Sequence, residues 1–357
     1  MINVTKVQLP PLEEYVRYLE GIWQRGHVTN HGPLVVELER QLAAQLEVPH
    51  VYVVTNGMLA LHIAIRALRL SGSVLTTPFS YVATTAAPVW EGLRPIYADI
   101  DAGYCLDPDA ARAAWADDTS AILATHVYGN ACQIEALQTL ASERGAAVIY
   151  DAAHAYGARY QGRPLASYGD ISILSFHATK LFHTVEGGAL ITHRADLAQR
   201  IEYLRNFGHD GPEHFHDAGT NAKMSEFHAA MGLCMLPRMP ATVAGRAAVV
   251  ALYDELLSGL PLQQPLYREG LQRNYAYYPV VFPDENSLLQ ARQVLNAENI
   301  YPRRYFYPSL SELSYVQAAT PPYAGEISRR VLCLPLWESL DGFQVRRIAS
   351  LIRKVLA

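Results

Sequence analysis

Short stretches of apolar, often β-branched residues recur along the first 240 residues, separated by segments whose apolar residues fall at helical spacing. The apolar stretches are residues 51–54, 74–77, 95–99, 121–125, 147–151, 171–175 and 189–192. They are almost continuously apolar, which is typical of strands that are covered on both faces. Their alternation with helices predicts an α/β fold with a mainly parallel, seven-stranded sheet. Ligands of such sheets bind at the carboxyl ends of the strands.

The predicted helices are marked by apolar residues three and four positions apart. Two such runs are Leu61, Ile65 and Leu68, and then Ile134, Leu137 and Leu140. After Pro237 and Pro240 the pattern changes to an alanine-rich helix over 241–257, a strand over 274–282 and helices over 288–298 and 345–356. We therefore expect a large domain of residues 1–240 and a smaller α+β domain of residues 241–357. The polar segment 208–219, bounded by glycines, is predicted to be a surface loop.

Composition narrows the class of protein. The chain carries 29 Lys+Arg against 34 Asp+Glu, a formal net charge of −5, so it lacks the basic excess of a general nucleic-acid binder. No stretch approaches the roughly 18 apolar residues of a membrane-spanning helix, and the first residues lack the pattern of a signal peptide. The four cysteines are far apart in sequence and have no zinc-site spacing. We expect a cytoplasmic protein with reduced, mostly buried thiols that binds neither nucleic acid nor membrane.

A lysine follows the sixth predicted strand, within the run Ser-Phe-His-Ala-Thr-Lys at residues 175–180. A side chain just past a buried strand is partly desolvated. Desolvation lowers the pKa of a lysine and makes its amine the nucleophile that Schiff-base chemistry requires. Gly187 and Gly188 would let the backbone approach a flat ligand closely. The alternative is an ordinary loop lysine, so Lys180 needs the support of other residues.

Asp151 supplies that support, because it ends the strand over 147–151 and would point toward the same edge of the sheet. A buried carboxylate together with a lysine is what pyridoxal 5′-phosphate (PLP) needs. The carboxylate keeps the pyridine nitrogen protonated, and the protonated ring acts as an electron sink. His154 could hydrogen-bond the phenolic oxygen of that ring. The alternatives are a helix N-cap for Asp151 and an ordinary buried histidine for His154.

Phosphate donors and a stacking ring complete the predicted site. Residues 55–58, Thr-Asn-Gly-Met, turn a strand end into a helix whose free N–H groups and dipole favour a phosphate. Ser175 could add a hydroxyl donor, and Tyr81 could stack on a planar ring. An Asn-Gly turn is common in α/β proteins, and an aromatic residue at a strand end is more often core or surface packing. Convergence of all these groups on successive strand ends is what favours a PLP site.

Taken in order, the segments 55–61, 78–84, 151–154, 175–188 and 219–225 resemble the DegT-type nucleotide-sugar aminotransferases, over essentially the whole chain. The block that carries Lys180 and ends in Glu-Gly-Gly is highly specific to that family. The resemblance implies a PLP aminotransferase of fold type I that forms homodimers with composite active sites. It also implies L-glutamate as amino donor and pyridoxamine phosphate (PMP) as the intermediate form of the cofactor.

The resemblance assigns roles around the cofactor ring. Lys180 matches the lysine that forms the Schiff base and moves protons during amino transfer. Asp151 matches the partner of the pyridine nitrogen. His154 matches the residue that contacts the phenolic oxygen, and Tyr81 matches the stacking aromatic.

A second group of residues matches the phosphate site of the family. Gly57, Met58 and Ser175 match the cradle, and Asn221 matches an asparagine that reaches the phosphate from the partner subunit. Met58 departs from the family pattern, which usually has threonine there. Methionine keeps the backbone N–H and lacks the hydroxyl, so we expect phosphate binding with one hydrogen bond fewer, worth about 1 kcal/mol.

The sequence around the lysine, residues 176–188, is most similar to family members that aminate C4″ of dTDP-4-keto-6-deoxyglucose. The product would be a 4-amino-4,6-dideoxy sugar nucleotide for O-antigen and lipopolysaccharide biosynthesis. The open alternatives are a C3 keto-sugar aminotransferase, a PLP-dependent sugar dehydratase of the same fold, and a non-catalytic regulatory protein that kept the fold. Dehydratases of this fold carry histidine in place of the lysine, so Lys180 favours amino transfer.

Candidate contacts to the substrate lie in predicted loops. Arg303 and Arg304 offer forked donors that suit a diphosphate, and the alternative is a solvated surface pair. Tyr305 follows them, and Asn30 and His209 are further candidate substrate contacts. The histidines around His209 are spaced by two on an irregular loop with no helix or strand to fix them, so we assign no metal.

Overall fold

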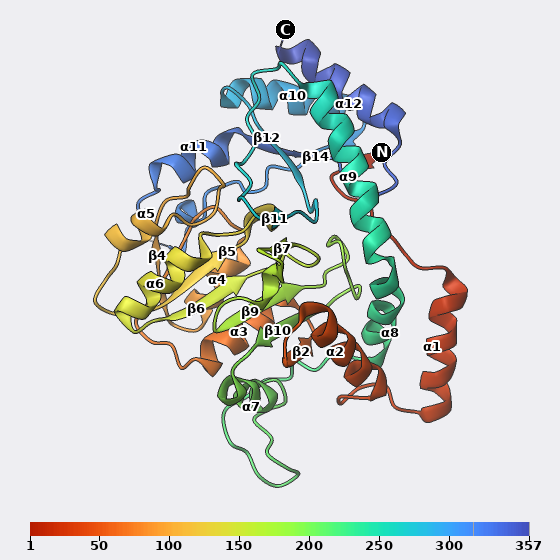
Figure 1. Cartoon of the computed structure of the whole chain (residues 1–357), viewed down its shortest axis with the longest axis vertical. Coiled ribbons are helices and arrows are strands. Elements are labelled where there is room, and N and C mark those ends of the chain that lie inside the picture. The colour runs from red at the N-terminus through yellow and green to blue at the C-terminus, as the bar shows by residue number, and fades with distance from the viewer. Residues whose placement is uncertain (317, 357) are drawn as a thin grey trace.

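The computed structural model describes residues 1–316 and 318–356, and its larger part is built on a seven-stranded sheet (Figure 1). Across the sheet the strands run β2 (His50–Val54), β10 (Gly188–Thr192), β9 (Ile171–Ser175), β6 (Ala147–Asp151), β5 (Thr119–Thr125), β3 (Ser73–Thr76) and β4 (Arg94–Tyr97). Neighbouring strands are parallel except at β10, which is antiparallel to both β2 and β9. The predicted α/β fold with a mainly parallel sheet is confirmed, and each predicted strand coincides with an observed one.

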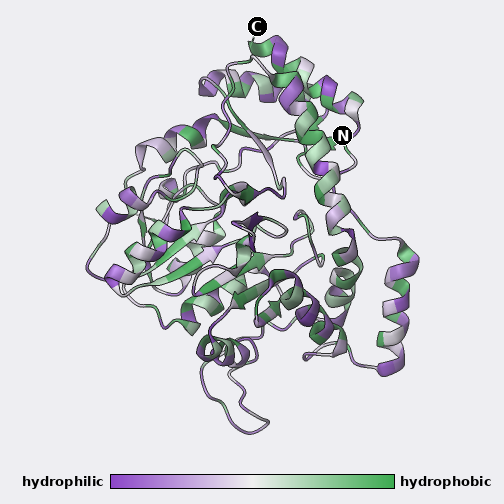
Figure 2. Cartoon of the chain, viewed as in Figure 1, coloured by the Kyte–Doolittle hydropathy of each residue, from purple (hydrophilic) through white to green (hydrophobic). Residues whose placement is uncertain are grey.

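Both faces of the sheet are covered by helices, which explains why the strands are apolar almost throughout. Val148 and Tyr150 of β6 belong to one apolar cluster, while Ile149 between them belongs to another. On the first face lie α2 (Pro33–Leu46) and α6 (Ile134–Arg144), and on the other lie α3 (Gly57–Ala67), α4 (Ala83–Trp90) and α7 (Ala195–Leu204). Successive side chains of a strand point to opposite faces, so a strand between two helical layers must be apolar at every position. Figure 2 shows apolar residues concentrated in this central layer.

The smaller part is centred on β12 (Tyr278–Val281) and β14 (Val331–Leu334), which pair antiparallel. They share an apolar cluster with α9 (Met239–Leu257), α10 (Glu285–Ala297) and α12 (Gly342–Leu356). The helix predicted from 241 begins at Met239, because Pro240 lies in the first turn, where no backbone N–H is needed. The strand β1 (Ile2–Asn3) pairs with β13 (Ile300–Tyr301), so the N-terminus also packs in this part. Division of the chain at residue 240 stays a prediction.

The remaining elements connect and flank these two parts. They are α1 (Leu12–Arg25), α5 (Pro108–Ala113), β7 (Arg159–Tyr160), β8 (Arg163–Pro164), α8 (Glu226–Met235), β11 (Leu271–Gln272), α11 (Pro322–Arg330) and short 3-10 turns at Val127–Gly129, Leu165–Ser167, Leu236–Arg238 and Leu310–Glu312. The strand β11 pairs with β7, which joins the segment after α9 to the segment after β6. The helix α1 packs on α8 at one side of the molecule (Figure 1).

The strand predicted over 274–282 is shorter than expected. Only Tyr278–Val281 is a strand, because Tyr275 has a positive φ of 55° and Asn274 is held by its side chain. The Asn274 amide donates to the carbonyl oxygens of His154 and Tyr156 at 2.7 and 2.9 Å. The sequence pattern missed this, because hydrogen bonds to residues more than a hundred positions away leave no periodicity.

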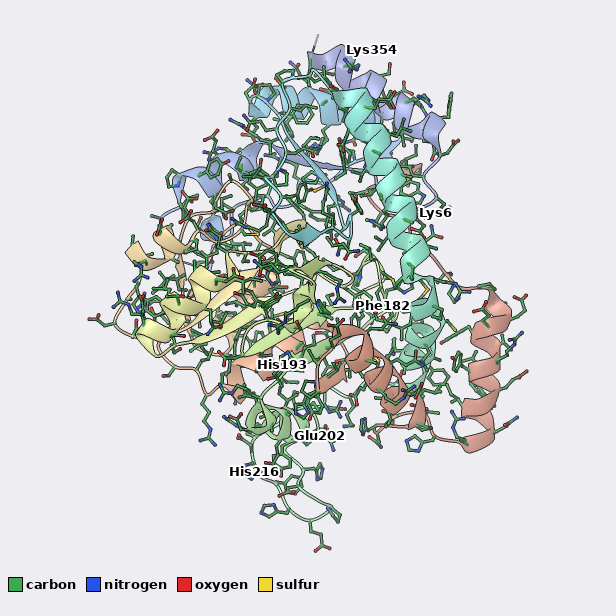
Figure 3. The ribbon with its side chains drawn as sticks, viewed as in Figure 1. Lys6, Phe182, His193, Glu202, His216 and Lys354 are labelled. Atoms are coloured by element: carbon green, nitrogen blue, oxygen red, sulfur yellow. The ribbon has the colours of Figure 1, made fainter. Side chains whose placement is uncertain are left out.

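The segment 208–219 is the expected surface loop. It projects from the end of α7, is mostly exposed, and carries His216 (Figures 1 and 3). All four cysteines are buried and free. Within residues 1–316 and 318–356, no group of three or more His, Cys, Asp or Glu side chains could hold a metal ion. Over the same residues, no helix is both long and apolar enough to cross a membrane.

Candidate active site

A cavity of about 400 Å³ opens at the carboxyl ends of the central strands. The structure brings seven of the eight candidate cofactor residues together in its wall: Gly57, Met58, Tyr81, Asp151, His154, Ser175 and Lys180. They come from the ends of β6 and β9 and from the turns that follow β2, β3, β6 and β9. Parallel strands that end at one edge place groups distant in sequence side by side, as expected for this class of sheet.

Lys180 lies in a turn after β9 whose backbone is closed by a hydrogen bond from its N–H to the carbonyl of His177 at 2.8 Å. Burial lowers the pKa of Lys180 to about 8, against the opposing effect of the Asp151 carboxylate. A lysine with this pKa is neutral about a tenth of the time at pH 7, a far larger fraction than for an exposed lysine. It can therefore act as a nucleophile and as a proton carrier.

Asp151 is 4% exposed and accepts two hydrogen bonds. The Thr84 hydroxyl donates to Oδ2 at 2.8 Å, and the N–H of Ala153 donates to Oδ1 at 3.1 Å. Burial raises the pKa of this carboxyl, whereas both hydrogen bonds and the Lys180 charge lower it. A buried carboxylate needs further partners, and a protonated ring nitrogen would be one.

His154 is held as a neutral donor. Its Nδ1 accepts the backbone N–H of Tyr128 at 3.2 Å, so in the neutral ring the proton sits on Nε2. Burial keeps the pKa of His154 well below its usual value. Phe306 stacks on this ring at 5.7 Å and Tyr277 meets it edge-on at 4.9 Å. The ring is thus fixed between the large and small parts of the molecule, with one N–H to donate.

The phosphate cradle forms where α3 begins. The Asn56 side chain caps the helix by accepting the N–H of Leu59 at 2.8 Å, which leaves the N–H groups of Gly57 and Met58 free of intrahelical partners. A Cβ on Gly57 would lie 3.0 Å from the Cβ of Ser175, so the hydroxyl of Ser175 stands directly beside the helix start. Backbone donors, a helix dipole and a hydroxyl make an anion site of the kind that a phosphate needs.

The two glycines after Lys180 allow neighbouring segments of the protein to pack closely. A Cβ on Gly188 would meet the carbonyl carbon of Asn56 at 2.6 Å and the nitrogen of Gly57 at 2.7 Å. A Cβ on Gly187 would overlap Thr184. Both positions are therefore filled by neighbouring protein atoms. The glycines allow β10 to approach the phosphate turn. That they also let the backbone approach a flat ligand stays a prediction.

Five candidate residues lie outside this cavity, and three of them lie at or near a second one. Asn30 and His209 line a second cavity of about 720 Å³, together with Arg205 and Lys223. Asn221 is exposed nearby and accepts a hydrogen bond from Nζ of Lys223 at 2.7 Å. Figure 3 shows Glu202, another residue of this cavity, at the α7 end of the molecule. Within one chain, these residues do not share the cavity of Lys180.

The adjacent arginines Arg303 and Arg304 differ in their surroundings. Both line a third cavity of about 750 Å³, which adjoins the first because Tyr81, Tyr305 and Phe306 line both. Arg304 donates to Glu285 at 2.7 Å and to the carbonyl of Arg329 at 2.6 Å. Arg303 is exposed. Among the described residues that line this cavity none is acidic, so it favours an anion.

Sequence reasoning missed several groups in the wall of the Lys180 cavity. Phe306 comes from the smaller part of the chain, and no local motif marks it. Ser80, Thr84 and Thr125 place buried hydroxyls beside Asp151. The spacing of Ser80 and Thr84, one helical turn apart in a segment already singled out, was the available signal.

Known proteins share this architecture. The profile of the DegT/DnrJ/EryC1/StrS aminotransferase family matches residues 12–353. The dTDP-4-amino-4,6-dideoxy-D-glucose transaminase of Shigella dysenteriae is 37% identical over 362 residues, with 99% of each chain covered. The GDP-perosamine synthase of Vibrio cholerae is 28% identical, with 94% of this chain and 95% of the relative covered.

Solved structures of aminotransferases have the same fold as this chain. DesI in the presence of its TDP-sugar product superposes with a TM-score of 0.94 at 35% identity, covering 99% of this chain and 92% of that chain. PseC of Helicobacter pylori, an aminotransferase of pseudoaminic acid biosynthesis, superposes with a TM-score of 0.93 at 22% identity, covering 99% of each chain. The second likeness shows the fold alone.

Proposed function

The chain belongs to the DegT/DnrJ/EryC1/StrS aminotransferase family, and on that premise we propose that it aminates C4″ of dTDP-4-keto-6-deoxyglucose with L-glutamate as donor. As a member of this family it is a PLP-dependent aminotransferase. The observation that carries the proposal is the cavity in which Lys180 and Asp151 meet beside the phosphate cradle. The choice of sugar is supported by the Shigella dysenteriae relative, which matches over nearly the whole chain.

The residues of the cavity fit PLP. The N–H groups of Gly57 and Met58 and the Ser175 hydroxyl would hold the phosphate. Asp151 would face the ring nitrogen, Nε2–H of His154 the phenolic oxygen, and Tyr81 the ring face. When bound, PLP supplies an electron sink for the charge left at a carbon that loses its proton.

Lys180 does the proton chemistry. Its amine, with a pKa near 8, takes the proton from Cα of L-glutamate in the first half-reaction. In the second half-reaction the same nitrogen delivers a proton to C4″ of the sugar. Asp151 holds its negative charge throughout, and the walls made by Tyr277 and Phe306 keep water away from the reacting atoms.

The third cavity supports a nucleotide as the carrier of the sugar. It adjoins the Lys180 cavity through Tyr81 and Tyr305, and its free cationic groups suit a diphosphate. Because Arg304 is occupied by Glu285, Arg303 is the arginine that we assign to the diphosphate. Tyr305 offers an apolar face and a hydroxyl beside it.

We also propose a homodimer with composite sites, working in the cytoplasm in O-antigen and lipopolysaccharide biosynthesis. Asn221 is exposed and lies outside the cavity of its own chain, which supports its assignment to the phosphate of the partner subunit. Asn30 and His209 lie near it, beside the projecting loop, and would approach the sugar of the same neighbouring site.

A substrate panel tests the proposed reaction. Purified protein with PLP and L-glutamate is offered dTDP-, UDP- and GDP-linked 4-keto-6-deoxy sugars, and the products are identified by mass spectrometry and NMR. We expect a 4-amino-4,6-dideoxy sugar from the dTDP substrate, with 2-oxoglutarate as co-product, and no turnover by Lys180→Ala. Amination at C3, a dehydrated sugar without 2-oxoglutarate, or preference for another nucleotide would each contradict the proposed substrate.

A further inference from the structure

Three buried hydroxyls form a hydrogen-bonded chain that ends on Asp151. Thr84 Oγ1 lies 2.8 Å from Asp151 Oδ2, Ser80 Oγ lies 2.7 Å from Thr84, and Thr125 Oγ1 lies 2.9 Å from Ser80. The three residues are between 0 and 2% exposed, so water does not compete for these hydrogen bonds. They come from the loop after β3, the start of α4 and the end of β5, three elements that meet beside Asp151.

The direction of these hydrogen bonds follows from counting protons. An ionised Asp151 can only accept, so the single hydroxyl proton of Thr84 is used on Oδ2. The contact between Thr84 and Ser80 then requires the proton of Ser80, and the contact between Ser80 and Thr125 requires the proton of Thr125. Every hydroxyl therefore donates toward Asp151, and each bond polarises the next.

We propose that Thr84, Ser80 and Thr125 are positioning residues that keep Asp151 ionised and aimed at the ring nitrogen of PLP. The inference rests on the proposed function, since it assumes that Asp151 faces that nitrogen. A hydroxyl that donates to a carboxylate favours its charged form, and a chain of three donates more strongly than one. The stronger the negative charge on Asp151, the more firmly the ring nitrogen keeps its proton.

Other groups near Asp151 do not replace this effect. Lys180 faces the carboxylate from the loop after β9, but its nitrogen is the group that reacts, so its charge is not constant during turnover. His154 is neutral, and Tyr81 presents an aromatic ring. The N–H of Ala153 holds the other carboxylate oxygen. The hydroxyl chain is thus the neutral support of the carboxylate oxygen Oδ2.

The same chain ties the stacking ring to the carboxylate. Ser80 immediately precedes Tyr81, and its hydroxyl is bonded on both sides. A shift of the loop that carries Tyr81 would therefore break the links on which Asp151 depends. The ring face and the ring nitrogen of the cofactor would be positioned together.

Thr84→Val tests the proposal, because valine keeps the shape of threonine and removes its hydroxyl. The matched control is Thr84→Ser, which keeps the hydroxyl. We measure the pH midpoint of the visible absorption of bound PLP, the dissociation constant of PLP, and the unfolding temperature of the PLP-free protein. The midpoint is the pKa of the Lys180 nitrogen when it is bonded to PLP. A PLP ring with less positive charge raises this pKa, so the nitrogen keeps its proton to higher pH.

We expect Thr84→Val to raise the midpoint by about one pH unit and to weaken PLP binding by about tenfold, with Thr84→Ser close to the wild type. Ser80→Ala should raise the midpoint less, because one bond to Asp151 survives. A wild-type midpoint in Thr84→Val overturns the inference, as does an equal shift in Thr84→Ser. If Thr84→Val does not fold, Ser80→Ala decides in the same way.

Asp151→Asn separates this inference from the proposed function. If Asp151→Asn raises the midpoint and Thr84→Val leaves it unchanged, the placement of PLP stands and the hydroxyl chain has no such role. If Asp151→Asn itself leaves the midpoint unchanged, Asp151 does not face the ring nitrogen. The proposed cofactor placement then fails, and this inference fails with it.

Discussion

At the scale of single residues, surroundings decide what a side chain can do. Arg303 and Arg304 are neighbours of the same type, yet one is exposed beside a cavity and the other is bound to Glu285. His154 is restricted to one donor because Tyr128 occupies its other ring nitrogen. Lys180 has a lowered pKa because it is desolvated, and the nearby Asp151 limits the shift.

The pKa of Lys180 leads to a prediction for the PLP-free protein. The neutral amine is the form that reacts with an amine reagent, so labelling of Lys180 should rise with pH around a midpoint near 8. Asp151→Asn removes a charge that favours the protonated amine, so it should move the midpoint to lower pH. The chain has only four lysines, which makes the labelled site easy to assign by mass spectrometry.

Lys354, at the exposed end of α12 (Figure 3), serves as the control for reagent reactivity at each pH. Prior addition of PLP should protect Lys180 and leave Lys354 unprotected. A midpoint that Asp151→Asn leaves in place or raises would show that the two groups do not interact as the geometry indicates.

At the scale of elements, the site depends on close packing between one strand and one turn. The strand β10 begins at Gly188, directly against the turn between β2 and α3 that forms the phosphate cradle. The apolar pattern predicted both the strand and the helix. It could not predict that they touch, because contact across the sheet is not recorded in periodicity.

Gly188→Ala should destabilise the protein by about 1–3 kcal/mol, since its Cβ would lie 2.6 Å from Asn56 backbone and force the cradle apart. PLP binding should weaken as well. Urea unfolding measures the first effect and PLP titration the second. Gly342→Ala is the matched control, because its nearest neighbour, Cδ2 of Leu252, is 3.6 Å away. Equal stability of the two variants would contradict the close approach.

At the scale of the whole molecule, the candidate residues fall into two groups. Lys180, Asp151 and the cradle share one cavity, whereas Asn30, His209 and Asn221 lie near a second cavity at the α7 end, beside the projecting loop (Figure 1). A homodimer would join the second group of one chain to the first group of its partner. This arrangement can be tested without knowing the sugar.

Two inactive variants should restore each other if the sites are composite. Lys180→Ala lacks the amine, and Asn221→Asp would place a negative charge against the phosphate of the partner subunit. In a mixed dimer, one site has both defects and the other has none. After unfolding and refolding together, a mixture of equal amounts should recover about a quarter of native activity, since half of the dimers are mixed and each has one intact site.

Refolding each variant alone is the control, and it should give no recovery. If the mixture is as inactive as its components, Asn221 serves its own chain or the chains do not exchange. Recording the mixed dimer by native mass spectrometry distinguishes these two outcomes.

The sequence by itself determined the seven strands, the mainly parallel sheet that they form and the polar groups at the strand ends. Apolar periodicity and the residues that follow a strand are local properties. The segment at 274–277 departs from its prediction because Asn274 bonds to distant carbonyls. Only the tertiary structure decided the order of the strands, the tautomer of His154, the difference between Arg303 and Arg304, and the hydroxyl chain beside Asp151. The bonds of Arg304 to Glu285, of Tyr128 to His154 and of Thr84 to Asp151 join residues 19, 26 and 67 positions apart, and such partners meet only when the sheet is assembled.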